Sequence, residues 1–132
     1  MEAMMTIRRY RDPIVWTHFL LFGNCYLYAY SGYIVLSIVM MCNVILSLLY
    51  HRSHEENEVF GAGDRLFCHL SVMCIAFQIF KFCTLKEVFG CIFWLICSIL
   101  IKDQSIYNYK LWHTAWHIMV WLGNIIVWII LP

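Results

Sequence analysis

The sequence predicts an all-α fold, a polytopic membrane bundle of about five transmembrane helices. Of the 132 residues, 63% are hydrophobic and only 13% are charged, whereas a soluble domain carries about a quarter charged residues. The charges gather in short stretches between apolar runs of about 17 to 23 residues, long enough to cross a hydrocarbon core of about 30 Å. The net charge of only +1 gives no support for a nucleic-acid partner, so the expected partner is the lipid bilayer.

Five apolar runs account for the expected helices. Residues 1–13 are expected to form a cytoplasmic N-terminal segment and residues 14–132 a single transmembrane helical domain. Pro13 stands at the start of the first run, a position that favours proline. Asp64 follows the glycines of the one long polar loop and is expected to be the N-cap of the third helix. The helices are expected at residues 14–30, 33–50, about 66–82, about 88–101 and 111–131.

The distribution of lysine and arginine predicts the orientation. With the N-terminus in the cytoplasm, seven basic residues fall on that side and two on the other. The seven are Arg8, Arg9, Arg11, Arg52, Arg65, Lys102 and Lys110, and the two are Lys81 and Lys86. A cleaved signal peptide is an alternative interpretation of the first run, because Ala29-Tyr30-Ser31 fits the small-x-small cleavage pattern. The polar residues His18 and Asn24 within that run speak against it.

A pair of histidines stands out in the last apolar run. His113 and His117 are four residues apart, which places them on one face of a helix with Cβ atoms roughly 6 Å apart. Ionisable side chains inside a membrane are costly and commonly mark functional sites. The spacing therefore predicts that both imidazoles could hold one metal ion.

The predicted topology brings further polar residues to the same membrane depth. His51 ends the second helix on the cytoplasmic side, Asp64 begins the third there, and the helix with His113 and His117 starts there as well. Ser47 precedes His51 by four residues and lies one turn deeper on the same face. Three segments that are distant in sequence are therefore expected to form one site.

Three neutral imidazoles suit zinc, and a catalytic zinc commonly keeps three protein ligands and an open position for water. We expect His51, His113 and His117 to be these ligands. Zinc lowers the pKa of its bound water to about 7. Asp64 is expected to accept a proton from that water and pass it on, and Ser47 to hydrogen-bond the water or a substrate carbonyl.

These motifs, in this order, resemble the CREST superfamily of alkaline ceramidases, PAQR (adiponectin-type) receptors and Per-type membrane hydrolases. The resemblance rests on Ser47-xxx-His51, Asp64 and His113-xxx-His117, and it covers residues 33–132. It implies a zinc site formed by these residues and a lipid substrate. Characterised members have seven core helices, so this chain resembles a shortened member, and a homo-oligomer that completes the missing wall is conceivable.

The leading hypothesis is a zinc-dependent membrane hydrolase of a lipid amide or ester bond, either ceramidase-like or phospholipase-like. The alternative is a non-catalytic multi-pass membrane protein that uses the metal structurally, which the reduced number of helices favours. A third hypothesis is haem ligation between helices by paired histidines. The sequence names neither the substrate nor the organelle.

The remaining histidines receive other interpretations. His54 follows His51 by three residues and is expected in the solvated loop, although it is the obvious substitute ligand. His69 lies five residues after Asp64, so it is expected to point away from the site. His18 and Asn24 could face the site or form hydrogen bonds between helices.

Overall fold

The computed structural model describes residues 12–132 and folds them into five α-helices. The helices are α2 (Pro13–Tyr30), α3 (Ile34–Arg52), α4 (Glu58–Phe82), α5 (Leu85–Asp103) and α6 (Tyr109–Ile130), with a short 3-10 helix, η1 (Gln104–Ile106), before α6. Described residues outside these helices form only turns and short connections. The expected all-α class is confirmed.

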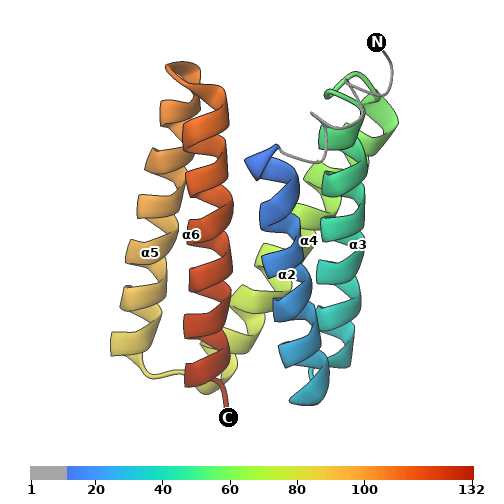
Figure 1. Cartoon of the computed structure of the whole chain (residues 1–132). Coiled ribbons are helices and arrows are strands. Elements are labelled where there is room, and N and C mark those ends of the chain that lie inside the picture. Colours follow the sequence, from blue (N-terminus) through green and yellow to red (C-terminus); the bar gives the residue numbers. More distant parts are fainter. Residues whose placement is uncertain (1–11) are drawn as a thin grey trace.

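The helices form an elongated bundle in which the main contacts follow the order α4, α3, α2, α6, α5. Figure 1 shows α5 and α6 as an antiparallel pair beside α2 and α3, with α4 crossing behind α2. The starts of α2, α4 and α6 and the ends of α3 and α5 lie at one end of the bundle, uppermost in Figure 1 and called the upper end here. Residues distant in sequence can therefore meet at this end.

Helix α4 begins earlier than the sequence predicts, and the expected N-cap at Asp64 is wrong. The N-cap is Asn57, whose side chain accepts hydrogen bonds from the backbone N–H groups of Val59 and Phe60. Because asparagine satisfies these otherwise unpaired donors, the helix can start at Glu58. Asp64 therefore lies in the second turn, deeper in the bundle than an N-cap would.

Two glycines that resemble a loop signal in fact pack α4 against α3. A Cβ atom on Gly61 would lie 2.8 Å from Cε2 of Tyr50, and one on Gly63 would lie 3.0 Å from Cδ1 of Leu46. Small residues allow helix backbones to approach closely in membrane proteins. These glycines thus serve helix packing, which is why their helix-breaking tendency does not decide the local structure.

The last two helices also extend beyond their apolar runs. Helix α5 starts at Leu85 because Thr84 and Glu87 form a capping box, and the side chain of Asn108 caps α6 at the backbone N–H of Leu111. Charged residues occupy the end turns of α5, where they can reach water. The apolar runs at residues 88–101 and 111–131 therefore begin later than the helices that contain them.

Three of the helices, α3, α4 and α6, are long and apolar enough to cross a membrane. This composition is compatible with an integral membrane protein. Helix α2 contains His18, Asn24 and four aromatic polar residues, and α5 carries charges in both end turns. The expected count of about five spans therefore stays a prediction.

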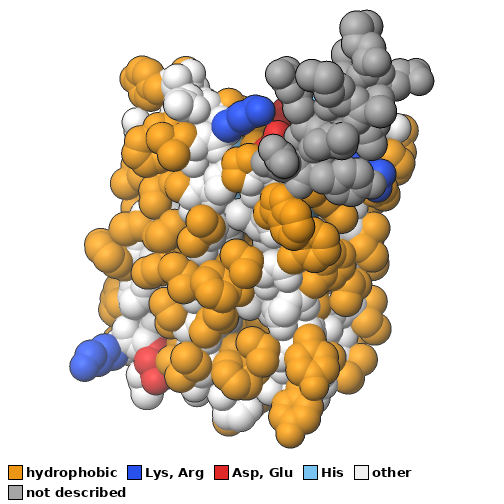
Figure 2. Space-filling view, in the orientation of Figure 1, with side chains coloured by type: hydrophobic (Ala, Val, Ile, Leu, Met, Phe, Trp, Pro, Cys, Tyr) orange, Lys and Arg blue, Asp and Glu red, His pale blue; other side chains and the backbone are white. Residues whose placement is uncertain are grey.

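The outer surface of the described bundle is largely apolar. Figure 2 shows hydrophobic side chains over most of the visible face, with charged side chains near its two ends. Large side chains at least 67% exposed include Val35, Met73, Phe80, Leu85 and Phe93. Such a surface suits contact with lipid tails.

Polar contacts fix α2 against α6 below the upper end. The amide of Asn24 donates to the carbonyl of Trp121 at 3.2 Å, and the hydroxyl of the fully buried Tyr28 donates to the carbonyl of Asn124 at 2.9 Å. Burying a polar group is costly unless it is hydrogen-bonded, and these bonds pair the amide nitrogen of Asn24 and the hydroxyl of Tyr28. These bonds set the rotation of α2 relative to α6, and with it the direction of the side chains above them.

Candidate metal centre

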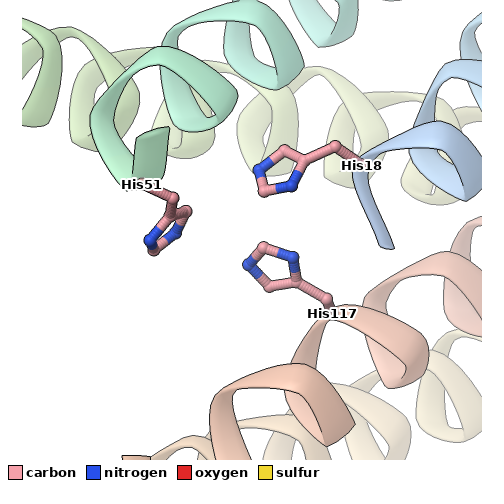
Figure 3. A group of neighbouring side chains, drawn as sticks. All are labelled: His18, His51 and His117. Carbon is pink, nitrogen blue, oxygen red and sulfur yellow. The ribbon is translucent and has the colours of Figure 1, made fainter. Parts of the chain in front are cut away.

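Four histidines meet at the upper end of the bundle. His18 lies in the second turn of α2, His51 in the last turn of α3, and His113 and His117 in the second and third turns of α6. The exposed fraction is 0% for His18, 3% for His117 and 9% for His113, and the side chain of His51 is 6% exposed. Figure 3 shows His18, His51 and His117, each from a different helix, pointing toward one another.

Three of these rings lie near enough to share one ion. One ring nitrogen each from His18, His51 and His117 lies within 4.8 Å of the other two. Such a triangle contains a point no more than about 2.8 Å from each corner, whereas zinc–nitrogen bonds are about 2.0 to 2.1 Å long. Shifts of under about 1 Å would bring the rings to bonding distance. The three residues can therefore hold a metal ion, and imidazole ligands suit zinc, copper, nickel and iron alike.

The tautomer of His18 leaves one nitrogen unpaired inside the bundle. Its Nδ1 lies 2.8 Å from the backbone carbonyl oxygen of Ile14. A carbonyl only accepts hydrogen bonds, so Nδ1 carries the proton and Nε2 a lone pair. That Nε2 is fully buried and has no hydrogen-bond partner. An orphaned buried acceptor is costly, and a metal ion would satisfy it.

The same reasoning fixes the tautomer of His117. The hydroxyl of Thr17 donates to the carbonyl of Ile14 at 2.7 Å, so it has no second proton to give. The hydroxyl oxygen also lies 2.8 Å from Nδ1 of His117 and must accept that proton. The Nε2 of His117 therefore carries a lone pair as well. Two consecutive residues of α2 therefore contribute to the centre. His18 supplies a ring nitrogen, and Thr17 fixes the tautomer of His117.

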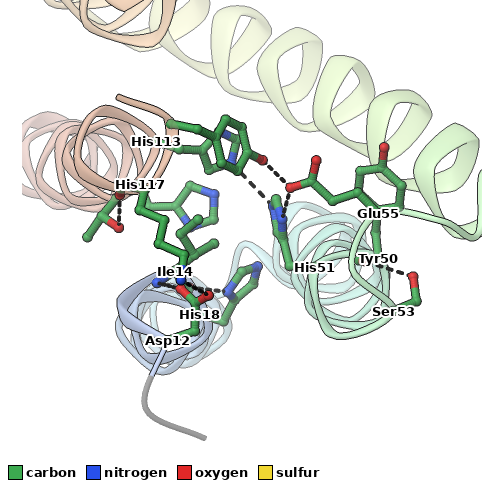
Figure 4. Close-up of polar contacts among 12 residues, drawn as sticks. Asp12, Ile14, His18, Tyr50, His51, Ser53, Glu55, His113 and His117 are labelled. Carbon is green, nitrogen blue, oxygen red and sulfur yellow. Dashed lines mark hydrogen bonds and ion pairs between the residues drawn. The ribbon is translucent and has the colours of Figure 1, made fainter. Parts of the chain in front are cut away.

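His51 donates its Nδ1 proton to a carboxylate. Its Nδ1 lies 2.9 Å from Oε1 of Glu55, and the same oxygen accepts a hydrogen bond from the hydroxyl of Tyr109 (Figure 4). With Nδ1 as donor, the neutral ring has its lone pair on Nε2. Metal-ligating histidines typically donate their second nitrogen to a carboxylate, carbonyl or other oxygen, and all three histidines of the triangle do so.

His113 is placed differently from the other three. Its Nε2 lies 3.3 Å from Nε2 of His51, and its ring centroid is 4.8 Å from those of His51 and His117. Because Nε2 of neutral His51 carries a lone pair, Nε2 of His113 is the donor in this bond. The ring also packs against Tyr109 and Trp116. His113 thus borders the centre as a hydrogen-bond donor to one of its rings.

Ser47 of α3 and Asp64 of α4 lie near each other and near His51. The Asp64 carboxylate interacts electrostatically with His51 and with Lys102 of α5. Ser47 is 7% exposed. Both residues therefore lie beside the histidines, as the sequence predicts, although Asp64 reaches this position from inside α4.

A cavity of about 280 Å³ opens at the upper end and reaches His51. Its wall includes His51, together with Glu55 and Tyr109 that contact it. Lys110 of α6 and Asp12 before α2 form an ion pair at 3.7 Å on the same wall. Small polar solutes, including metal ions, can therefore approach His51 from the upper end.

The structure brings together all the predicted site residues: Ser47, His51, Asp64, His113 and His117. It adds His18, which the sequence left undecided, although His18 is near the start of a helix that begins at the same end. His54 lies on the cavity wall beyond His51. His69 is exposed on α4 and its Nδ1 donates to the carbonyl of Arg65 at 2.6 Å.

Comparisons of the chain with models of known families, with curated proteins and with solved structures find no match.

Proposed function

We propose that this chain is a zinc-dependent integral membrane hydrolase that cleaves an amide or ester bond of a lipid. The observation that carries the proposal is the convergence of three buried imidazoles, each with its Nδ1 proton held by an oxygen acceptor. In this tautomer the Nε2 lone pairs of His18 and His117 are available to a metal ion, and that of His51 becomes available when its hydrogen bond from His113 is released. A helical bundle that only required packing would favour apolar side chains here, because buried polar groups are costly.

A zinc ion bound by three histidines keeps one position for water and makes hydroxide accessible near pH 7. The side chains around the centre supply the rest of the proposed chemistry. Asp64 accepts a proton and returns it to the leaving group, while Ser47 holds the Asp64 carboxylate in place. The cavity at the upper end admits water, and the apolar outer surface keeps the lipid substrate close.

The ordered motifs Ser47-xxx-His51, Asp64 and His113-xxx-His117 resemble the CREST superfamily and support a zinc site with a lipid substrate, although the resemblance makes His113 a ligand where the geometry favours His18. In that resemblance, the substrate is a ceramide or a phospholipid. The proposal places the upper end in the cytoplasm, because the four basic residues near it outnumber the two at the opposite end. The four are Arg52, Arg65, Lys102 and Lys110; the arginines at 8, 9 and 11 lie outside the described residues.

Metal content tests the first step. We expect the protein purified in detergent to contain about one zinc per chain, and His117→Ala to lose it because one of three ligands is missing. His69→Ala is the matched control, since His69 is exposed on α4 and donates only within its own helix. Wild-type protein without stoichiometric zinc, or zinc that survives His117→Ala, would refute the proposed centre.

Lipid turnover tests the second step. We expect zinc-loaded protein in mixed micelles to release fatty acid from a ceramide or a phospholipid, to lose this activity on chelation and to regain it on addition of zinc. Testing both lipids separates amide from ester hydrolysis. If zinc-loaded protein releases no fatty acid from either lipid, the hydrolase proposal is refuted, while the metal centre itself is not.

One observation favours a structural metal as the second candidate. His113 is near enough to His51 and His117 to become a fourth ligand after a rotation of its ring. Four protein ligands close a tetrahedral zinc site and leave no position for water. In that case chelation would lower the melting temperature and no lipid would be hydrolysed, whereas the catalytic proposal expects His113→Ala to retain zinc.

A further inference from the structure

The turn after α3 has an uncommon backbone. His54 and Glu55 both adopt positive φ angles, 57° and 64°. The N–H of Glu55 bonds the carbonyl of Tyr50 at 3.0 Å, which closes the end of the helix. Glycine or asparagine normally occupies left-handed positions in such helix ends, because a Cβ atom makes this conformation unfavourable. Two consecutive residues with larger side chains therefore hold a strained turn.

The strained turn has one clear consequence for the metal centre. It turns the chain back so that the Glu55 carboxylate reaches Nδ1 of His51, one helical turn earlier, at 2.9 Å. The same carboxylate oxygen accepts the hydroxyl of Tyr109 at the start of α6. Glu55 thus joins the end of α3 to the helix that carries His113 and His117 (Figure 4). Its side chain is 32% exposed and lines the cavity.

We propose that Glu55 is a positioning residue for the metal centre, held by the strained turn so that it orients His51 and supplies a negative charge to the ion. The inference rests on the proposed function, because it assumes that the histidines bind a metal. Three neutral imidazoles leave both positive charges of a divalent ion uncompensated. A carboxylate on the far nitrogen of one ligand raises the basicity of that ligand and fixes its ring.

The alternative is that Glu55 merely stabilises the turn and the α3–α6 contact. The two roles predict different readouts for one substitution. Glycine at position 55 removes the carboxylate but accepts the φ of 64° without strain. If Glu55 serves the metal, Glu55→Gly weakens zinc binding. If Glu55 serves only the fold, Glu55→Gly changes the melting temperature of the metal-free protein and leaves its zinc affinity unchanged.

The experiment measures zinc affinity by competition with a chromophoric chelator in detergent, and the melting temperature of metal-free protein. We expect Glu55→Gln to bind zinc about 10-fold more weakly, because the amide keeps an acceptor but loses the charge, and Glu55→Gly about 100-fold more weakly. Glu56→Gln is the matched control, since Glu56 is the next residue of the same loop and is exposed. It should bind zinc like the wild type.

Cobalt substitution adds a spectroscopic readout. Cobalt in the wild-type centre should show visible bands that shift in Glu55→Gln and stay unchanged in Glu56→Gln, because only the first change alters the hydrogen-bond partner of a ligand. Wild-type zinc affinity in both Glu55→Gln and Glu55→Gly would overturn the inference while leaving the metal centre intact. A wild-type protein that binds no zinc would instead overturn the proposed function.

Discussion

Replacing Thr17 by valine tests the tautomer of His117, on which the metal centre depends. Valine has nearly the shape of threonine but lacks the hydroxyl that accepts the Nδ1 proton of His117 at 2.8 Å. In the metal-free variant, His117 can move its proton to Nε2, so that Nδ1 no longer presents an unpaired donor to the valine. Metal binding requires the opposite tautomer, with Nδ1–H facing the valine methyl group. The penalty therefore falls on the metal-bound form.

The magnitude follows from the cost of an unsatisfied buried donor. His117 is only 3% exposed, and leaving such a group unpaired costs about 1 to 3 kcal/mol. Every 1.4 kcal/mol is about a factor of ten in a binding constant. We therefore expect Thr17→Val to bind zinc about 10- to 100-fold more weakly than the wild type, in line with other losses of a ligand's hydrogen-bond partner.

The assay is a competition titration with a chelator in detergent, carried out on the wild type, Thr17→Val and Thr114→Val. Thr114 is the matched control, because its hydroxyl donates to the carbonyl of Lys110 at 2.6 Å within α6. The control should bind zinc as tightly as the wild type. If Thr17→Val also retained wild-type affinity, His117 would not bind the metal through Nε2 and the tautomer assignment would be wrong.

Further predictions concern catalysis, packing and the identity of the bound group. Asp64→Asn should retain zinc but lose at least 100-fold in lipid turnover, because the amide cannot accept the proton; unchanged turnover would remove Asp64 from the mechanism. Gly123→Ala should destabilise the fold by about 1 to 3 kcal/mol in denaturant titration, since the new Cβ would lie 2.5 Å from Nε1 of Trp94. The control Gly90→Ala, with nothing within 4 Å of the added atom, should be stabilised by up to about 1 kcal/mol. Purified protein should show no Soret absorption, and a Soret band would favour the haem hypothesis instead.

The pattern of apolar runs was sufficient to predict the fold class and the approximate helices, because helix length and hydropathy are local properties. It failed at the start of α4. There, Gly61 and Gly63 resemble a loop, but their close approach to Tyr50 and Leu46 of α3 shows that they serve packing between helices. Asparagine is a favoured N-cap, so Asn57 in the sequence could have indicated an earlier start of α4.

The sequence predicted the part of the candidate site that depends only on how deep each residue lies in the bundle. His113 and His117 share a helix face by their spacing, and His51 ends a helix at the same end of the bundle. Depth alone does not say which way a helix is rotated about its axis. The rotation of α2 is set by contacts with α6, so the sequence could not decide whether His18 faced the other histidines.

The sequence by itself determined that this chain is an apolar bundle of helices with ionisable residues gathered at one end. Helix periodicity and hydropathy require no knowledge of neighbours, so they can be read directly from the residues. Only the tertiary structure decided that His18 completes the triangle with His51 and His117. It also decided the tautomers, because the acceptors at Ile14, Thr17 and Glu55 become partners only when the turns and helices that carry them come together.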